Sequence, residues 1–269
     1  MLGTRRVIAP IELYDFFGDA LAVRYWLTKR DYYLSFKTQI EEVNSIWSDD
    51  VSRELYESII EFRMTGDYSI LPKPDLTHQY FPQDIPAWKT PLRFVDCGAF
   101  DGDTLSNFQR ANIPIEALSA FEPDENNFRK LAQFVQANQK YFPQTNLYPC
   151  GVFSSTKKLS FNSGVGEASV TTVVGDAVVQ CVALDETIPT FTPTLIKMDI
   201  EGAEPDALLG ARNLIADSRP GLAISIYHRP EHLWQIPLLV KDLVKGEYQY
   251  FLRAHGFNDF DIVLYAIPN

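Results

Sequence analysis

Acidic residues gather in a short loop that directly follows an apolar run. The loop contains Asp96, Asp101 and Asp103, and two glycines, Gly98 and Gly102, lie within it. Glycines permit a tight turn and a close approach of the backbone to a ligand. A carboxylate about 6 Å from a phosphate costs roughly 3 kcal/mol at an effective dielectric near 20, and the dinucleotide pattern GxGxxG is absent. The loop therefore favours a ligand with cationic groups over a pyrophosphate.

A further carboxylate, Glu122, ends the next apolar run of the chain. In nucleotide-binding folds an acidic residue at this place accepts hydrogen bonds from the ribose hydroxyls of an adenosine. Together with the acidic loop, Glu122 predicts an adenosine cofactor without phosphates, and S-adenosylmethionine, with its ammonium and sulfonium groups, is such a ligand. Two alternatives stay open: Asp101 and Asp103 cap a helix and complement its dipole, and Glu122 is a solvated strand end.

Three more acids, Asp199, Glu201 and Glu204, follow a strongly apolar run, with Gly202 between them. Hard oxygen ligands of this kind suit magnesium, so this ion is compatible with the loop, although nothing else in the sequence supports a metal site. The alternative is the chemistry of a helix start, because acids favour a helix N-terminus and Pro205 suits its first turn.

His228 directly follows another apolar run, Leu222–Tyr227. Histidine titrates near neutral pH, so a neutral imidazole at this place can take a proton from a reacting hydroxyl. In the alternative, His228 satisfies backbone groups ahead of a helix near Pro230. The other histidines do not directly follow a predicted strand, and we expect no functional role for them: His78, His232 and His255.

The elements that must position these residues alternate between strands and helices from Leu92 onward. Apolar runs predict strands at residues 93–97, 117–121, 147–150, 195–200, 222–227, 250–252 and 262–267. The last two suit an antiparallel pair at one edge. We therefore predict an α/β fold with a doubly wound, mostly parallel seven-stranded sheet of the Rossmann-like type. Such folds bind ligands beyond the carboxyl ends of their strands, where the acidic loops would meet.

Two regions lie outside this alternation. Apolar residues recur at roughly helical spacing in the first 63 residues, at Tyr25, Trp26, Phe36, Ile40, Val43, Trp47, Leu55, Ile59 and Phe62. Residues 66–91 contain five prolines, which is typical of a loop or linker. A β insertion is predicted from 159–161 and 178–184. We expect a helical N-terminal region and linker at 1–90, with oligomer formation through these helices left open, and a second domain at 91–269.

Composition excludes several classes of function. Acidic residues outnumber basic ones by 35 to 24, and the formal charge of -11 repels nucleic acids and anionic membranes. No apolar stretch approaches the roughly 18 residues that span a bilayer, and the apolar run near the N-terminus is too short for a secretory signal. Three separated cysteines, Cys97, Cys150 and Cys181, indicate reduced thiols and a cytoplasmic protein.

Three motifs resemble those of FkbM-type methyltransferases. Residues 94–104 are similar to the first motif of that family, residues 120–124 to the second, and residues 196–204 to the most specific one. The stretch 225–231 fits as well, so the resemblance covers about residues 93–257. It implies a class I S-adenosylmethionine fold and transfer of a methyl group, usually to a hydroxyl on a sugar or natural product.

The motifs and positions together assign candidate site residues. Cofactor contacts are expected from Asp96, Gly98, Ala99, Asp101, Thr104, Glu122, Pro123 and Asp199. The expected catalytic residues are His228, Asp199 and Glu201, which would act on a small-molecule acceptor by direct displacement at the sulfonium methyl group. Two alternatives are a nicotinamide-dependent oxidoreductase, against which the acidic loop counts, and a non-catalytic module that binds an adenosine cofactor.

Overall fold

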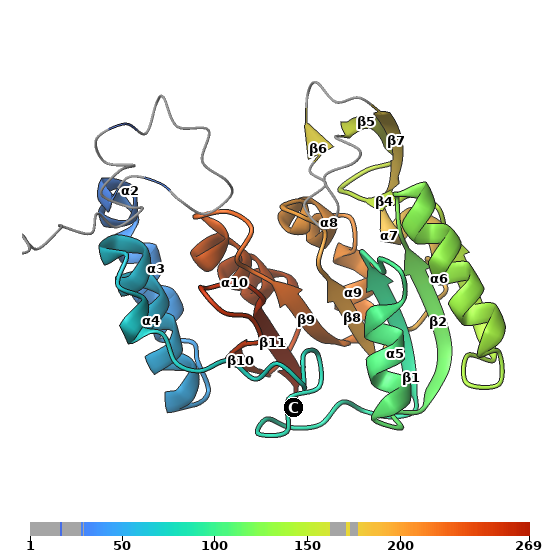
Figure 1. The fold of residues 1–269 in the computed structure, drawn as a ribbon, viewed down its shortest axis with the longest axis horizontal. Coiled ribbons are helices and arrows are strands. Elements are labelled where there is room, and N and C mark those ends of the chain that lie inside the picture. The colour runs from blue at the N-terminus through green and yellow to red at the C-terminus, as the bar shows by residue number, and fades with distance from the viewer. Residues whose placement is uncertain (1–16, 18–27, 29, 162–170, 173–176) are drawn as a thin grey trace, which may run out of the picture.

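A seven-stranded sheet forms the centre of the computed structural model, which describes residues 17, 28, 30–161, 171–172 and 177–269 (Figure 1). In spatial order the strands are β10 (Tyr248–Ala254), β11 (Ile262–Pro268), β9 (Gly221–Ser225), β8 (Leu195–Met198), β1 (Leu92–Cys97), β2 (Ile115–Phe121) and β3 (Gln144–Tyr148). Neighbours from β9 to β3 are parallel, whereas β11 runs antiparallel to both β9 and β10. This arrangement confirms the predicted α/β fold.

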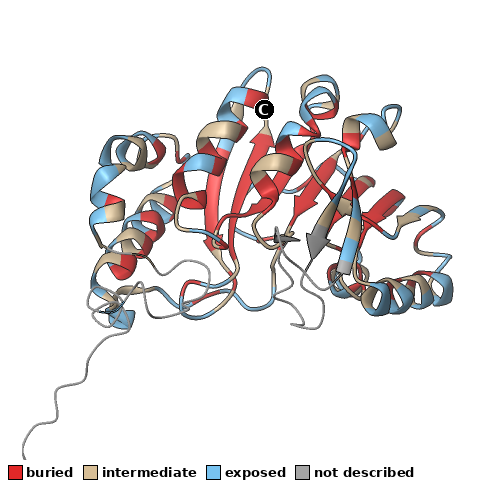
Figure 2. Cartoon of the chain, turned by 90° about the horizontal axis from the view of Figure 1, so that it is seen from above, coloured by how far each residue is buried: buried red, intermediate tan, exposed pale blue. Residues whose placement is uncertain are grey.

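Helices cover both faces of this sheet, so the strands other than the edge strand β3 are largely buried between two layers (Figure 2). The helices are α5 (Asp103–Arg110), α6 (Glu125–Ala137), α7 (Leu184–Thr187), α8 (Glu204–Leu209), α9 (Arg212–Ser218) and α10 (His232–Leu243). Successive residues of a strand face opposite layers: Phe94 packs in one buried cluster with residues of α5 and α6, and Val95 in another with residues of α8, α9 and α10. Burial on both faces explains why these strands are continuous apolar runs.

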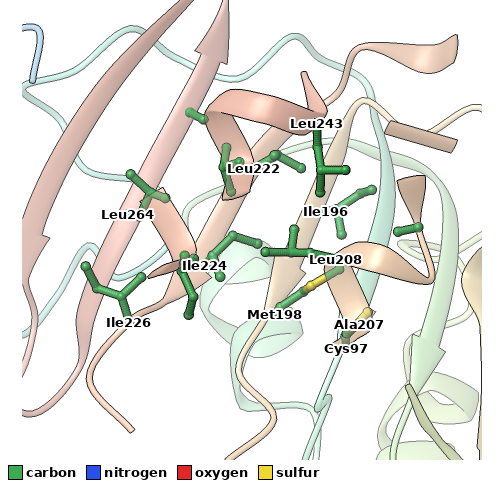
Figure 3. Packing of buried hydrophobic residues seen from close by; sticks show 14 of the residues in the cluster. Cys97, Ile196, Met198, Ala207, Leu208, Leu222, Ile224, Ile226, Leu243 and Leu264 are labelled. Carbon is green, nitrogen blue, oxygen red and sulfur yellow. The ribbon is translucent and has the colours of Figure 1, made fainter. Parts of the chain in front are cut away.

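The layer formed by α8 and α10 fixes the ends of two central strands. Figure 3 shows Ile196 of β8 and Leu222 and Ile224 of β9 in one cluster with Leu208 of α8 and Leu243 of α10. Full burial of such a side chain stabilises the fold by about 1.5–3 kcal/mol. The loops that follow β8 and β9 therefore start from firmly held positions.

Three helices precede the sheet in the chain and lie beside its β10 edge in Figure 1: α2 (Arg30–Ser35), α3 (Lys37–Asn44) and α4 (Asp50–Thr65). Helix α4 packs on β10, and Ser52 Oγ accepts a hydrogen bond from Leu252 N at 2.8 Å. Ser48 Oγ accepts one from Tyr250 N at the same distance. These serines occupy backbone donors of an edge strand that would otherwise be open to other chains.

The remaining segments agree with their sequence patterns where the structure describes them. Helices are present around Val43 and Ile59, while Tyr25 and Trp26 lie outside the described residues. Between α4 and β1 the only regular element is a short 3-10 helix, Tyr68–Ile70. A second sheet contains β4 (Gly151–Val152), β5 (Lys157–Phe161), β6 (Thr171–Thr172) and β7 (Ala177–Val182). No helix within the described part of the chain is long and apolar enough to cross a bilayer.

Candidate active site

The carboxyl ends of β1, β2 and β8 surround a cavity of about 290 Å³. Its lining includes Gly98, Phe100, Asp103, Thr104, Glu122, Pro123, Lys197, Asp199 and Glu201, joined by Gln79, Tyr80, Tyr227 and Asp261 from other segments. Four of the candidate site residues are not part of the lining: Asp96, Ala99, Asp101 and His228. The cavity lies where folds of this kind bind their ligands.

The turn after β1 depends on Gly98. Its φ is +78°, and an added Cβ would lie 2.0 Å from the carbonyl oxygen of Asp199, so no side chain fits. The backbone N–H groups of Gly98 and Ala99 both donate to the carbonyl oxygen of Phe121 at 3.0 Å. The turn thus presses the loop after β1 against the loop after β8, and it places Ala99 in the buried core.

Glu122, at the end of β2, is only 6% exposed. Its Oε2 accepts a hydrogen bond from Phe100 N at 2.9 Å, and its Oε1 accepts one from Asp124 N at 2.8 Å. Burial raises the pKa of Glu122 to about 7 against the effect of these two donors. Each oxygen keeps a second lone pair, so the carboxylate can accept two more hydrogen bonds from a ligand in the cavity.

Asp96 is fully buried and forms an ion pair with Lys197 of β8, whose Nζ lies 3.1 Å from Asp96 Oδ1. The same Nζ donates to the carbonyl oxygen of Gly98 at 2.6 Å. Burial raises the pKa of Asp96 to about 6, although Lys197 opposes this shift. The pair therefore supports the turn after β1, and Asp96 affects the cavity through Lys197 and Gly98.

The start of α5 adds charge to the cavity. Gly102, with φ +94°, precedes the helix, and Asp103 Oδ1 accepts a hydrogen bond from Thr104 N at 2.6 Å. Asp103 and Thr104 line the cavity, as does Pro123 after β2, whereas Asp101 does not. Asp103 thus lies in the first turn of a helix, which agrees with the alternative that it complements the helix dipole. It also contributes negative charge to the cavity.

After β9, and behind the cavity lining, His228 lies close to three carboxylates. Its Nδ1 is 2.9 Å from Glu204 Oε1, and its Nε2 is 3.3 Å from Asp199 Oδ1 and 3.6 Å from Glu201 Oε2. His228 is 1% exposed and Glu204 is fully buried. The second oxygen of Glu204 lies 3.5 Å from His232 Nδ1. The loop after β8 and the residues after β9 therefore form one charged cluster.

These charges determine the protonation of His228. Burial lowers its pKa, but the carboxylates of Glu204 and Asp199 raise it more, so the pKa lies well above its usual value. Burial alone would raise the pKa of Asp199, but His228, Lys197 and Tyr80 together lower it. At neutral pH the ring is therefore an imidazolium paired with two carboxylates, and it has no lone pair with which to take a proton.

Asp199, Glu204 and His228 could offer three ligand atoms to one metal ion, as judged over the described residues. The three ligand atoms lie within 4.8 Å of one another. Each carboxylate is already paired with a nitrogen of the ring, Glu204 with Nδ1 and Asp199 with Nε2. Glu201, the other acid considered for magnesium, also faces Nε2. The paired His228 offsets the charge of these carboxylates, so the cluster does not require a metal ion to balance it.

Tyr80, from the irregular segment between α4 and β1, enters the cavity without any signal in the sequence. Its hydroxyl donates to Asp199 Oδ2 at 2.8 Å, and its ring centroid lies 5.3 Å from Lys197 Nζ. The prolines of this segment predicted only a loop. A single tyrosine in such a loop has no spacing or neighbour that relates it to a strand end, so sequence reasoning missed it.

Solved structures share this architecture. Methyltransferase FkbM from Methylobacillus flagellatus KT is similar with a TM-score of 0.75 and 25% identity, over 88% of this chain and 60% of that chain. The present chain thus spans 60% of the length of that protein. Weaker likenesses include fibrillarin from Aeropyrum pernix in complex with natively bound S-adenosyl-L-methionine, with a TM-score of 0.41 and 13% identity over 66% of this chain and 67% of that chain. Another is a putative rRNA methylase from Clostridium thermocellum, with a TM-score of 0.40 and 10% identity over 65% and 84% of the two chains.

No curated protein sequence matches the chain, but a family model does. The model of the methyltransferase FkbM domain matches residues 96–261, which is more than half of the chain. The matched region contains both acidic loops, Glu122 and His228. It agrees with the resemblance of the three sequence motifs and lends no support to the oxidoreductase alternative. The chain therefore belongs to the FkbM methyltransferase family.

Proposed function

We propose that this protein is an S-adenosylmethionine-dependent O-methyltransferase that acts on a hydroxyl group of a small-molecule acceptor, a sugar or a natural product. One observation carries the proposal: the carboxylates of Glu122 and Asp199, from the ends of the two strands that flank β1, line the same cavity. This pairing offers one place for an adenosine and another for the reacting groups.

The cavity then divides into two sides. The cofactor side consists of Gly98, Phe100, Asp103, Glu122 and Pro123, and the acceptor side consists of Tyr80, Asp199, Glu201, Tyr227 and Asp261. Glu122 fits the ribose hydroxyls because a lone pair remains on each of its oxygens. Asp103 adds negative charge that favours a sulfonium cation and opposes a pyrophosphate. The side chains present therefore fit S-adenosylmethionine better than a nicotinamide dinucleotide.

When bound, S-adenosylmethionine would supply a sulfonium methyl group to an acceptor oxygen, with S-adenosylhomocysteine as the leaving group. Asp199 accepts a hydrogen bond from the acceptor hydroxyl and so orients the oxygen for attack. The proton leaves late, when the oxygen has gained the methyl group and is strongly acidic, so a carboxylate of low pKa is a sufficient base. Glu201, whose side chain is 23% exposed, gives this proton a route to solvent.

His228 takes a different role from the neutral base that its place in the sequence suggested. As an imidazolium it stabilises the ionised carboxylate of Asp199 and holds it from one side. His228 is buried and is not part of the cavity lining. We therefore assign it as a positioning residue, and Asp199 and Glu201 as the residues that meet the acceptor.

Transfer of a labelled methyl group tests the proposal. The protein is incubated with methyl-labelled S-adenosylmethionine and a panel of neutral glycosides and hydroxylated natural products, with magnesium in one arm and EDTA in the other. Label recovered as a methyl ether supports O-methylation, and equal transfer in both arms supports metal-independent chemistry. Label on nitrogen or carboxylate contradicts the proposed acceptor group. Binding of S-adenosylhomocysteine without transfer to any acceptor favours the non-catalytic module.

A further inference from the structure

We propose that Tyr80 is a positioning residue for methyl transfer, which holds the carboxylate of Asp199 toward the place where the methyl group is transferred. The inference rests on the proposed function and assigns a role to the irregular segment between α4 and β1. This segment precedes the first strand of the sheet and lies outside the region matched by the family model.

The contacts of the Tyr80 side chain point at one carboxylate. The hydroxyl donates to Asp199 Oδ2 at 2.8 Å and accepts a hydrogen bond from Gln79 Nε2 at 3.2 Å. On the other oxygen, His228 Nε2 lies 3.3 Å from Asp199 Oδ1. The two oxygens of Asp199 are therefore held by different groups, one by the hydrogen bond from Tyr80 and the other by the ion pair with His228, and together these contacts orient the carboxylate. A second lone pair on each oxygen remains for a ligand.

The backbone of Tyr80 is fixed as firmly as its side chain. Its N–H donates to the hydroxyl of Tyr265 at 3.0 Å, and its carbonyl oxygen accepts from Trp88 Nε1 at 2.6 Å. Trp88 itself packs on Gly221 of β9, where an added Cβ would lie 2.5 Å from its ring. Tyr80 keeps a φ of 69°, an unfavourable value for a residue with a side chain, and such strain is retained mainly where the surroundings enforce it.

The hydrogen bonds beneath Tyr80 have a definite direction. The carbonyl oxygen of Asp75 can only accept, so His255 donates to it from Nδ1 at 2.8 Å. His255 Nε2 must then accept from the hydroxyl of Tyr265 at 2.7 Å, which leaves the oxygen of Tyr265 to accept from Tyr80 N. Every group in this chain is satisfied when the Tyr80 hydroxyl donates to Asp199. The segment therefore presents a fixed donor to the acceptor side of the cavity.

Sinefungin tests this role without knowledge of the acceptor. This analogue of S-adenosylhomocysteine carries a protonated amine in place of the transferred methyl group, so its amine reports on a carboxylate at that place. We would measure the affinities of sinefungin and S-adenosylhomocysteine by calorimetry for the wild type, Tyr80→Phe and Asp199→Asn. Tyr141→Phe is the matched control, because it removes the same hydroxyl group from a tyrosine outside the cavity lining. The hydroxyl of Tyr141 donates to the backbone carbonyl oxygens of Phe108 and Ile113.

The proposal expects the wild type to prefer sinefungin and Tyr80→Phe to reduce that preference about ten-fold, with little change for S-adenosylhomocysteine. Asp199→Asn should abolish the preference, and Tyr141→Phe should retain it. If Tyr80→Phe does not fold, Tyr265→Phe replaces it: this variant removes the acceptor of Tyr80 N, keeps the Tyr80 phenol, and should reduce the preference by a smaller factor.

Three results would overturn the proposal. An unchanged preference in Tyr80→Phe means that Asp199 is positioned without Tyr80. Equal wild-type affinities for the two ligands mean that Asp199 does not lie beside the transferred group, although the cofactor assignment stands. If neither ligand binds the wild type, the proposed function fails together with the role of Tyr80.

Discussion

The two sides that we propose for the cavity, one for the cofactor and one for the acceptor, are constructed differently. The cofactor side comes from short loops directly after β1 and β2, and hydrogen bonds between these loops, such as Phe100 N to Glu122, fix it. The acceptor side combines residues from distant segments, among them Tyr80, Asp199 and Asp261. We infer that cofactor affinity depends on local turns, whereas the placement of reacting groups depends on long-range contacts. Variants on the two sides should therefore have separable effects.

The largest effect is expected at Lys197, which touches both sides. Lys197→Met leaves Asp96 buried without its partner, which should lower the free energy of unfolding by about 3–5 kcal/mol. Without Lys197 the pKa of Asp96 rises further, so Asp96 gains a proton as the pH falls. The loss should therefore be larger at pH 8 than at pH 5, as measured by urea denaturation.

A double variant provides the control for this prediction. Asp96→Leu combined with Lys197→Met replaces both charges with apolar groups, and it should regain most of the lost stability. If Lys197→Met has the same free energy of unfolding as the wild type at pH 8, the ion pair between Asp96 and Lys197 does not hold the two sides of the cavity together.

An intermediate effect is expected at Glu122, and it should be confined to the cofactor side. Glu122→Gln removes hydrogen bonds to a charged group, worth about 1.5–3 kcal/mol, so the affinity for S-adenosylhomocysteine should fall ten-fold or more. Because the pKa of Glu122 is about 7, protonation should also weaken wild-type binding as the pH falls below that value. The variant should lack this pH dependence in calorimetry.

The matched control is Glu116→Gln, a change of an exposed carboxylate near the start of the same strand. It should leave the affinity unchanged at every pH. Wild-type affinity in Glu122→Gln, with an intact unfolding transition, would leave Glu122 with only a structural role at the strand end.

The smallest effect is expected from His228, and it is a dependence of the free energy of unfolding on pH. The pKa of His228 is higher in the folded protein than in the unfolded chain. The protonated side chain therefore stabilises the fold fully at pH values below the pKa of the unfolded state. This stabilisation is lost as the pH rises through the pKa of the folded state. Above about pH 7.5, where the unfolded histidine is neutral, the free energy of unfolding should fall as the pH rises, by at most about 1.4 kcal/mol per pH unit. His232 and His255, whose pKa values are lowered, are neutral in both states there.

Chemical denaturation at several pH values measures this slope. His228→Gln should flatten it, whereas His78→Gln, at an exposed position, should keep it. An equally steep slope in His228→Gln would show that His228 is not the imidazolium that positions Asp199.

The contrast between local turns and long-range contacts explains which site residues could be predicted from the sequence. Glu122 and Asp199 each end an apolar strand, so the fold pattern alone brought them to one rim. The protonation of His228 could not be predicted, because it depends on Glu204 approaching the far nitrogen of the ring. Tyr80 reaches the cavity only through hydrogen bonds to Trp88 and Tyr265, and these contacts leave no periodic pattern in the chain.

One strand shows how the sequence pattern misplaces an element boundary. The third strand was predicted at residues 147–150, but it spans Gln144–Tyr148. It is an edge strand whose first residues are polar and partly exposed, so the apolar run covers only its end. Pro149 then interrupts the ladder because it has no N–H to donate.

Calorimetric titration of the wild-type protein with S-adenosylhomocysteine and, separately, with NAD tests the central claim most directly. The claim is that the acidic cavity beyond β1, β2 and β8 binds the adenosine of a cofactor without phosphates. It predicts one saturable site for S-adenosylhomocysteine and no competition from NAD. Tight binding of NAD together with no binding of S-adenosylhomocysteine would contradict it.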